Sequence, residues 1–358
     1  MSGLTRERGA GRWRLGSGDG HLGIPVPGGA VRLHLRSGLV GLVGAALTLL
    51  LAAVALGIGD YPLSIPEVVD AALTDQGFAS TVVREWRLPR VLAAIVFGAA
   101  LAASGALFQT LTRNPLGSPD IIGFATGAHT GAIVSLTVVG PSFLGETAGA
   151  LVGGLGTAIL VYLLAWRGGV QGFRLIIVGI AVTAVLSAVN TYLLLLARTE
   201  VAMVASLWGS GSVSLVDWSD MAPALPLLAV LGVLTAVVVR PLRQLELGDD
   251  AAHAHGVPAE ATRLSVMAVG VALIALVTAV SGPIAFIALA APQIARRLAR
   301  SPGVPVGVAA VAGAFLLLAA DVVAQHVIPG SVPVGVVTVV IGGVYLVALL
   351  VQEARRQL

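Results

Sequence analysis

The side chains that could do chemistry are few and scattered in this chain of 358 residues. It has no cysteine, which excludes disulfides, thiolate metal sites and cysteine nucleophiles. All 21 arginine or lysine positions hold arginine, so the chain lacks the lysine that a Walker-type loop needs to reach phosphates. Of the six histidines, His253 and His255 stand two apart, which points them to different sides of a helix. The sequence therefore predicts no catalytic residue, no metal site and no cofactor.

Two polar segments flank one apolar run and could meet partner proteins. Residues 85–90 precede the run, and the guanidinium groups of Arg87 and Arg90 could pair with carboxylates on a partner. The alternative is that arginine and tryptophan anchor the helix end at the membrane surface. Residues 112–119 follow the run, and their two prolines and one glycine end one helix and begin the next. This segment is either a plain tight turn or a constriction at the mouth of a pathway.

Two further segments interrupt the second half of the chain. In residues 245–257, Gly248 and Asp249 can begin a short helix and Gly256 can end it, which gives either a motor-docking helix or a solvated loop helix. Residues 281–297 contain Gly-Pro and a later Ala-Pro, and they predict a helix broken twice. Broken helices at membrane depth usually line a cavity, although a turn followed by a proline kink explains the pattern equally well.

Long apolar runs must position these segments. Hydrophobic residues make up 57% of the chain and charged residues 11%, against about 25% charge in soluble domains, and the mean hydropathy is +0.96. Runs of about 20 apolar residues match the helix length that crosses a bilayer. We predict an all-α polytopic membrane protein with ten transmembrane helices, at residues 38–58, 91–111, 121–139, 147–165, 175–195, 221–239, 264–279, 284–294, 304–322 and 334–351.

Arginine placement predicts the orientation of these spans. With both termini in the cytoplasm, all arginines except Arg84, Arg87, Arg90 and Arg198 fall on the cytoplasmic side. Residues 1–37 are rich in glycine and arginine, and we expect a basic, disordered cytoplasmic tail ahead of a membrane domain at residues 38–358. Basic loops and tail explain a pI near 9.9, so we predict a lipid bilayer around the chain and no nucleic-acid partner.

The polar segments, taken in order, resemble the iron-siderophore and vitamin B12 permease family of ABC importers. The resemblance covers the chain from about Gly38 to its end, and within the family it is strongest to the ferric enterobactin permeases. It is carried by residues 87–90, by residues 98–123 with Gln109 and Asn114-Pro115-Leu116, and by residues 248–256, 282–296 and 333–338.

This resemblance implies a type II ABC importer permease fold and a set of partners in the plasma (inner) membrane of a bacterium. The permease would pair with a second permease subunit, with two copies of an ATPase subunit that uses the ATP, and with an extracytoplasmic siderophore-binding protein. By position, Arg87 and Arg90 would dock the binding protein, and Asn114 and Leu116 would form a cytoplasmic gate. The implied ATPase coupling helix comprises Gly248, Asp249, Asp250, Ala251, Ala252 and Gly256.

Three positions depart from the family pattern. Gln293 stands where many members have histidine, Gln325 where many have a docking arginine, and Ser331 where many have glutamate. A permease without one docking arginine fits better as half of a heterodimer than of a homodimer.

Other functions remain open at this point. Vitamin B12 or haem would suit the same fold, because specificity in such importers lies mainly in the binding protein. A secondary transporter or an intramembrane enzyme would need charged or nucleophilic clusters inside the spans. The ionisable residues Asp120 and Asp321 stand near span ends instead, which disfavours that class.

Overall fold

The computed structural model describes residues 21–357 except 27–28, 75–76, 121–122, 141–142, 167–171, 302 and 331. Over these residues the chain is helical apart from one antiparallel hairpin of β1 (His21–Val26) and β2 (Gly29–His34). The long helices are α1 (Leu35–Gly57), α4 (Leu88–Thr112), α5 (Phe124–Val138), α6 (Phe143–Ala165), α7 (Gly172–Leu196), α9 (Trp218–Leu245), α11 (Ala259–Ser281), α12 (Ile287–Ala299), α13 (Val306–His326) and α14 (Val334–Gln357). The short helices are α2 (Ile65–Leu73), α3 (Phe78–Thr81), the π-helix η1 (Val82–Arg87), α8 (Thr199–Gly209) and α10 (Asp249–Ala254).

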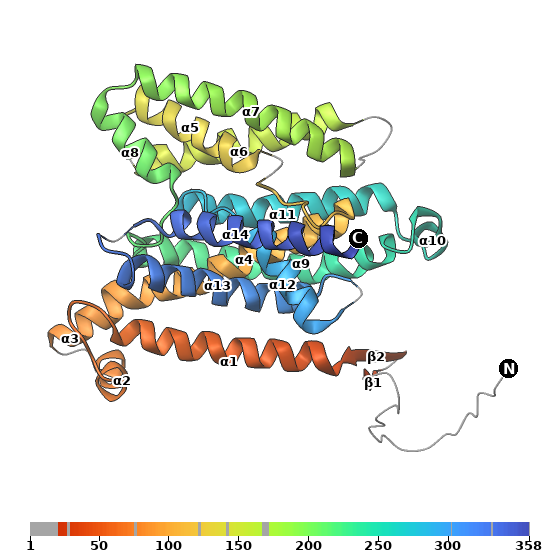
Figure 1. The fold of residues 1–358 in the computed structure, drawn as a ribbon, viewed down its shortest axis with the longest axis horizontal. Coiled ribbons are helices and arrows are strands. Elements are labelled where there is room, and N and C mark those ends of the chain that lie inside the picture. The colour runs from red at the N-terminus through yellow and green to blue at the C-terminus, as the bar shows by residue number, and fades with distance from the viewer. Residues whose placement is uncertain are drawn as a thin grey trace.

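The predicted all-α membrane fold is confirmed, and each of the ten predicted segments overlaps one of the long helices. Among the described residues, seven helical runs are long and apolar enough to cross a membrane, and two shorter apolar helices accompany them. The count of ten crossings and the orientation stay predictions. In Figure 1, α10 lies toward one end of the bundle, which we call the α10 end. Helices α2, α3 and α8 lie at the opposite end, which we call the α3 end.

The core of the bundle is built around α4. Of the most apolar window in the helical run 78–112, 78% is buried, against 17% for α1 and 11% for α7. The outer helices thus turn apolar side chains outward, as expected where lipid is the solvent. The side chains of Phe97, Leu101 and Phe108 on α4 are fully buried.

Glycines let α4 approach two helices at backbone distance. A β-carbon at Gly98 would overlap the carbonyl of Gly313 on α13, and one at Gly105 would overlap the carbonyl of Ala288 on α12. Small residues at such crossings permit the close packing that holds helices together in lipid. Helix α4 is therefore held against α13 in its first half and against α12 in its second half.

The structure differs from the sequence-based expectations at three places. The second span begins earlier than residue 91, because α3, η1 and α4 form one continuous helical run from Phe78 to Thr112. The helix predicted to break twice breaks once, between Ser281 and Ile287, and Pro292 lies inside α12. The part of the expected tail that the structure describes contains the β1–β2 hairpin, and α1 begins at Leu35.

Pro292 lies on α12 close to the crossing with α4. A proline lacks the N–H that would bond the carbonyl four residues earlier, so the helix leaves the Ala288 carbonyl without that bond. This carbonyl is the one against which Gly105 of α4 packs.

Candidate docking, gate and coupling sites

Arg87 lies at the α3 end and joins two elements of its own chain. It is the last residue of η1, and its guanidinium donates to the carbonyls of Leu56 and Tyr61, both at 2.7 Å. These carbonyls belong to the end of α1 and the loop that follows it. The first predicted docking residue is thus half-buried and ties α1 to the start of α4.

Arg90 lies one turn further along and forms a bidentate ion pair. Its Nε and Nη2 atoms lie 3.0 and 2.9 Å from the two carboxylate oxygens of Asp321 on α13. The side chain of Arg90 is 19% exposed and that of Asp321 is 5% exposed. Two parallel N–H···O bonds fix both position and orientation, so this pair joins α4 to α13 firmly.

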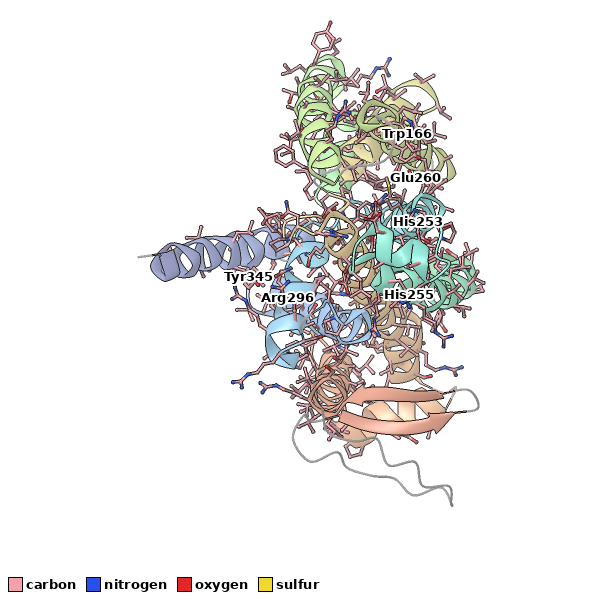
Figure 2. The ribbon with its side chains drawn as sticks, turned by 90° about the vertical axis from the view of Figure 1, so that its right-hand side faces the viewer. Trp166, His253, His255, Glu260, Arg296 and Tyr345 are labelled. Atoms are coloured by element: carbon pink, nitrogen blue, oxygen red, sulfur yellow. The ribbon has the colours of Figure 1, made fainter. Side chains whose placement is uncertain are left out.

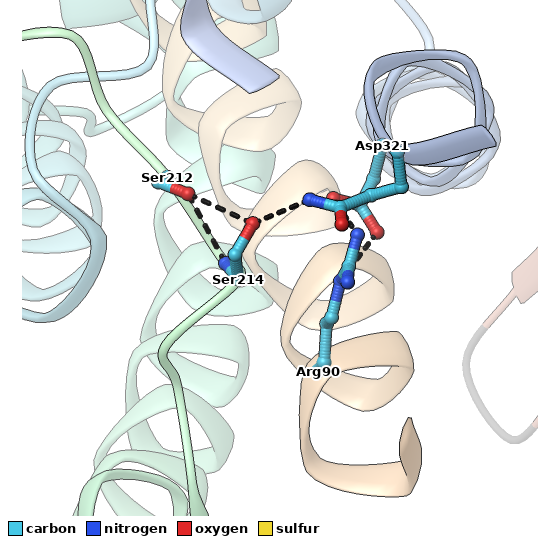
Figure 3. A network of polar contacts seen from close by, with 5 residues as sticks. Arg90, Ser212, Ser214 and Asp321 are labelled. Carbon is cyan, nitrogen blue, oxygen red and sulfur yellow. Dashed lines mark hydrogen bonds and ion pairs between the residues drawn. The ribbon is translucent and has the colours of Figure 1, made fainter. Parts of the chain in front are cut away.

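A second chain of polar contacts stands beside the ion pair (Figure 3). Gln325 on α13 donates to the Ser214 hydroxyl at 2.5 Å, and Ser214 contacts the Ser212 hydroxyl at 3.1 Å. Gln325, which stands at the expected third docking position, thus holds the loop between α8 and α9. Sequence reasoning noted Asp321 but missed its partner, although an acid inside an apolar helix is itself a signal that a cation lies nearby.

A cavity of about 740 Å³ opens beside these residues and has an aromatic rim. Tyr61, Phe78 and Trp86 meet edge to face, with ring centroids 5.4 and 5.8 Å apart. Each of the three rings is roughly half exposed. Trp86 belongs to the predicted docking segment, and the other two rings were not singled out from the sequence.

The predicted gate residues lie in the turn after α4, at the α10 end. Arg113 ends α4 in the left-handed conformation with φ of 50°. The Asn114 side chain accepts a hydrogen bond from the Leu116 backbone N–H at 2.9 Å, so the turn is closed by its own side chain. Leu116 is 41% exposed.

The predicted coupling helix is present with the predicted ends. Gly248 has φ of 107° and Gly256 has φ of 76°, conformations that favour glycine, and α10 runs between them. Both carboxylate oxygens of Asp249 accept hydrogen bonds from one nitrogen, Nη2 of Arg263 on α11, at 2.7 and 2.8 Å. The hydrogen bond from Arg263 holds the pKa of the Asp249 carboxyl below its usual value. Ala252 is fully buried against Leu245 and Ala259, so α10 packs against the end of α9 and the start of α11.

The exposed face of α10 carries histidines that do not form a metal site. Figure 2 looks onto this end and shows His253, His255 and Arg296 there. Among the residues that the structure describes, no group of three histidine or acidic side chains could hold a metal ion.

Comparison with known proteins identifies a family and several relatives of this chain. The FecCD transport family matches residues 47–352. The chain is 49% identical over 301 residues to the ferric enterobactin transport system permease protein FepG of Escherichia coli (strain K12), covering 84% of this chain and 91% of that protein. It is 35% identical over 328 residues to the achromobactin transport system permease protein CbrC of Dickeya dadantii (strain 3937), covering 88% and 92%. A solved metal-chelate type ABC transporter in an inward-facing conformation is similar at 27% identity and a TM-score of 0.77, over 88% of this chain and 99% of that one.

Proposed function

The chain belongs to the FecCD transport family, and on that premise we propose that it imports ferric siderophores of the catecholate, enterobactin-like class. It is a multi-pass protein of the bacterial inner membrane and a permease subunit rather than an enzyme, because its relatives are permeases of transport systems. The sequence identity to a ferric enterobactin permease over most of both chains is the observation that supports this choice of cargo.

The proposed path runs between the two ends of the bundle. A binding protein would deliver cargo at the α3 end, where Arg87 and Arg90 lie, and the cargo would leave past Asn114 and Leu116 at the α10 end. Helix α10 would transmit ATP-driven closure from the ATPase subunits. The transporter would then alternate between two states that its ligands favour differently.

The proposed assembly contains two permease subunits, two ATPase subunits and one extracytoplasmic binding protein. Gln325 supports a heterodimer, because it bonds Ser214 of its own chain where many relatives have a docking arginine. A sister subunit would then supply the missing charge.

Uptake of several iron-loaded siderophores, of haem and of cobalamin, in cells with and without this gene, tests the cargo. We expect loss of catecholate uptake alone. Loss of another siderophore, of haem or of cobalamin would refute the catecholate assignment, and normal uptake of every compound would refute the transport role.

The docking role predicts the effect of charge reversal. Arg87→Glu with Arg90→Glu is expected to weaken binding-protein capture about tenfold or more, because repulsion replaces attraction at the docking surface. Arg198→Glu is the matched control, since Arg198 is an exposed arginine that precedes α8 at the same end. Equal capture by the double variant and this control, in a pull-down from membranes, would refute docking through these arginines.

The coupling role predicts the effect of breaking α10. His253→Pro removes a backbone N–H from the last turn of this exposed helix, whereas His253→Ala keeps it. We expect the proline variant alone to lose co-purification of the ATPase and stimulation of its activity. An ATPase that stays bound and stimulated would exclude α10 as the coupling element.

A further inference from the structure

A buried amide pair lies next to the gate turn and has no part in the function described so far. Gln293 on α12 donates from Nε2 to Oε1 of Gln109 on α4 at 2.5 Å. Gln109 in turn donates from its own Nε2 to the Leu289 carbonyl of α12 at 2.9 Å. Both side chains are almost fully buried, with exposed fractions of 3% and 5%.

The contacts fix how the two amides point. The Leu289 carbonyl can only accept, so the Gln109 NH₂ group must face it and the Gln109 oxygen must face Gln293. The pair therefore bridges α4 and α12 twice, through residues 109 and 289 and through residues 109 and 293.

The same glutamine also holds the gate turn. The backbone carbonyl of Gln109 accepts the N–H of Asn114 at 3.1 Å. Gln293 Nε2 lies 3.5 Å from the carbonyl of Pro115, a long contact that places it directly under the turn. Gln109 contacts both Gln293 and the turn. A displacement of α12 that moved Gln293 would therefore also move the turn that contains Asn114 and Leu116.

The connection that precedes α12 has two features of a hinge. It is joined to α11 by five residues, 282–286, and both Gly282 and Phe286 have φ of 69°. A left-handed conformation is unfavourable for phenylalanine and is held only by surrounding structure. The connection therefore combines a helix break with backbone strain, features that occur at hinges.

The chemistry of the pair suits reversible contact. Two neutral amides can part and find other partners or water at a modest cost, whereas parting a buried ion pair leaves an uncompensated charge. The neutral pair can thus hold one state of the gate without locking it.

We propose that Gln109 and Gln293 are positioning residues of the cytoplasmic gate, and that their amide pair holds the turn against α12 in one state of the gate and parts in the other. This inference rests on the proposed transport function, because it presumes that Asn114 and Leu116 form a gate. It adds two residues that set which state the gate occupies.

The natural lack of cysteine provides the test. Leu116→Cys, as the sole cysteine of this chain, is labelled with a membrane-impermeant maleimide in inverted vesicles from cells that also make the partner subunits. Combining it with Gln293→Leu removes the pair with little change in volume, and Gln109→Asn shortens one side chain so that the amides cannot meet. We expect the resting labelling rate to rise about tenfold in both, as loss of one to two hydrogen bonds allows.

Two controls separate gating from general loosening. Ser104→Ala removes another buried hydrogen bond of α4, from the Ser104 hydroxyl to the Gly270 carbonyl at 2.6 Å, without touching the gate turn. Gln293→His supplies the residue that many relatives have at this position and can still donate. We expect both to label at the rate of the parent Leu116→Cys chain.

Unchanged labelling in either Gln293→Leu or Gln109→Asn would overturn the proposal, as would an equal rise in Ser104→Ala. The labelling needs no cargo, so its result stands apart from the uptake measurement. Failure of uptake with a normal labelling pattern would count against the transported compound and not against the gate pair.

Discussion

The two ends of α4 are held by different chemistry. At the α3 end, Arg90 and Asp321 form a charged bidentate pair between α4 and α13. At the α10 end, Gln109 and Gln293 form a neutral pair between α4 and α12. Helix α13 is continuous, whereas α12 follows a break. The charged contact thus joins α4 to the continuous helix α13. The neutral contact joins α4 to α12, the helix that we propose to move.

This difference bears on the docking hypothesis. Both nitrogen atoms with which Arg90 meets Asp321 are already used, and Arg87 is bonded to two backbone carbonyls. A guanidinium carries five N–H donors, so a carboxylate on a binding protein would bind the donors that these contacts leave over. We therefore expect Arg90 to contribute as much to the stability of the α3 end as to docking.

The largest expected effect comes from breaking the ion pair. Arg90→Met leaves the Asp321 carboxylate buried without a counter-charge, and we expect the free energy of unfolding to fall by about 3 kcal/mol. Asp321→Leu should cost a similar amount, and the double variant should recover most of the loss because no buried charge remains. Unfolding followed in detergent micelles measures the cycle. Additive losses would show that the two charges do not depend on each other.

A smaller effect is expected from closing the glycine crossings. Gly98→Ala and Gly105→Ala each force a methyl group against a backbone carbonyl, on α13 and on α12 respectively. We expect each to lower the free energy of unfolding by about 2 kcal/mol. If α12 moves as proposed, only Gly105→Ala should also raise the labelling of Leu116→Cys. Equal labelling in the two variants would remove the distinction between a rigid and a movable neighbour.

How far the sequence predicted this arrangement depends on the range of the contacts. The ends of α10 were predicted correctly, because Gly248, Asp249 and Gly256 are local signals that act on their own backbone. The long apolar helices were located for the same reason, since hydropathy is a property of each segment. The partners of Arg90 and Gln109 were missed, because they lie 231 and 184 residues away and no local periodicity encodes such pairs.

The errors in the predicted boundaries concern two prolines. The run from Phe78 continues through η1 into α4 although the second span was predicted to begin at residue 91, and Pro89 fits because proline is tolerated in the first turn of a helix. Pro292 suggested a second break, and the structure shows it inside α12 with Gly105 against the carbonyl that it frees. A local rule thus explains the first place, and the second lies where α12 packs on α4.

The smallest expected effect belongs to the exposed ion pair of Asp249 and Arg263 at the α10 end. This pair shows how much less a surface charge contributes than the buried contacts do. Asp249 is 47% exposed and its pair with Arg263 is worth about 0.5 kcal/mol after screening by solvent. Because the Arg263 hydrogen bond lowers the pKa of Asp249, this stabilisation is complete above the ordinary aspartate pKa of about 4 and is lost as the pH falls through the lower folded value. Amide exchange of residues 249–254, corrected for intrinsic rates, should therefore show constant protection from pH 8 to about 5 and a decline below about 4. Asp249→Asn should start from slightly lower protection and lack that decline. A decline near neutral pH in the unmodified chain would show that the Asp249 carboxylate is not the group that sets this protection.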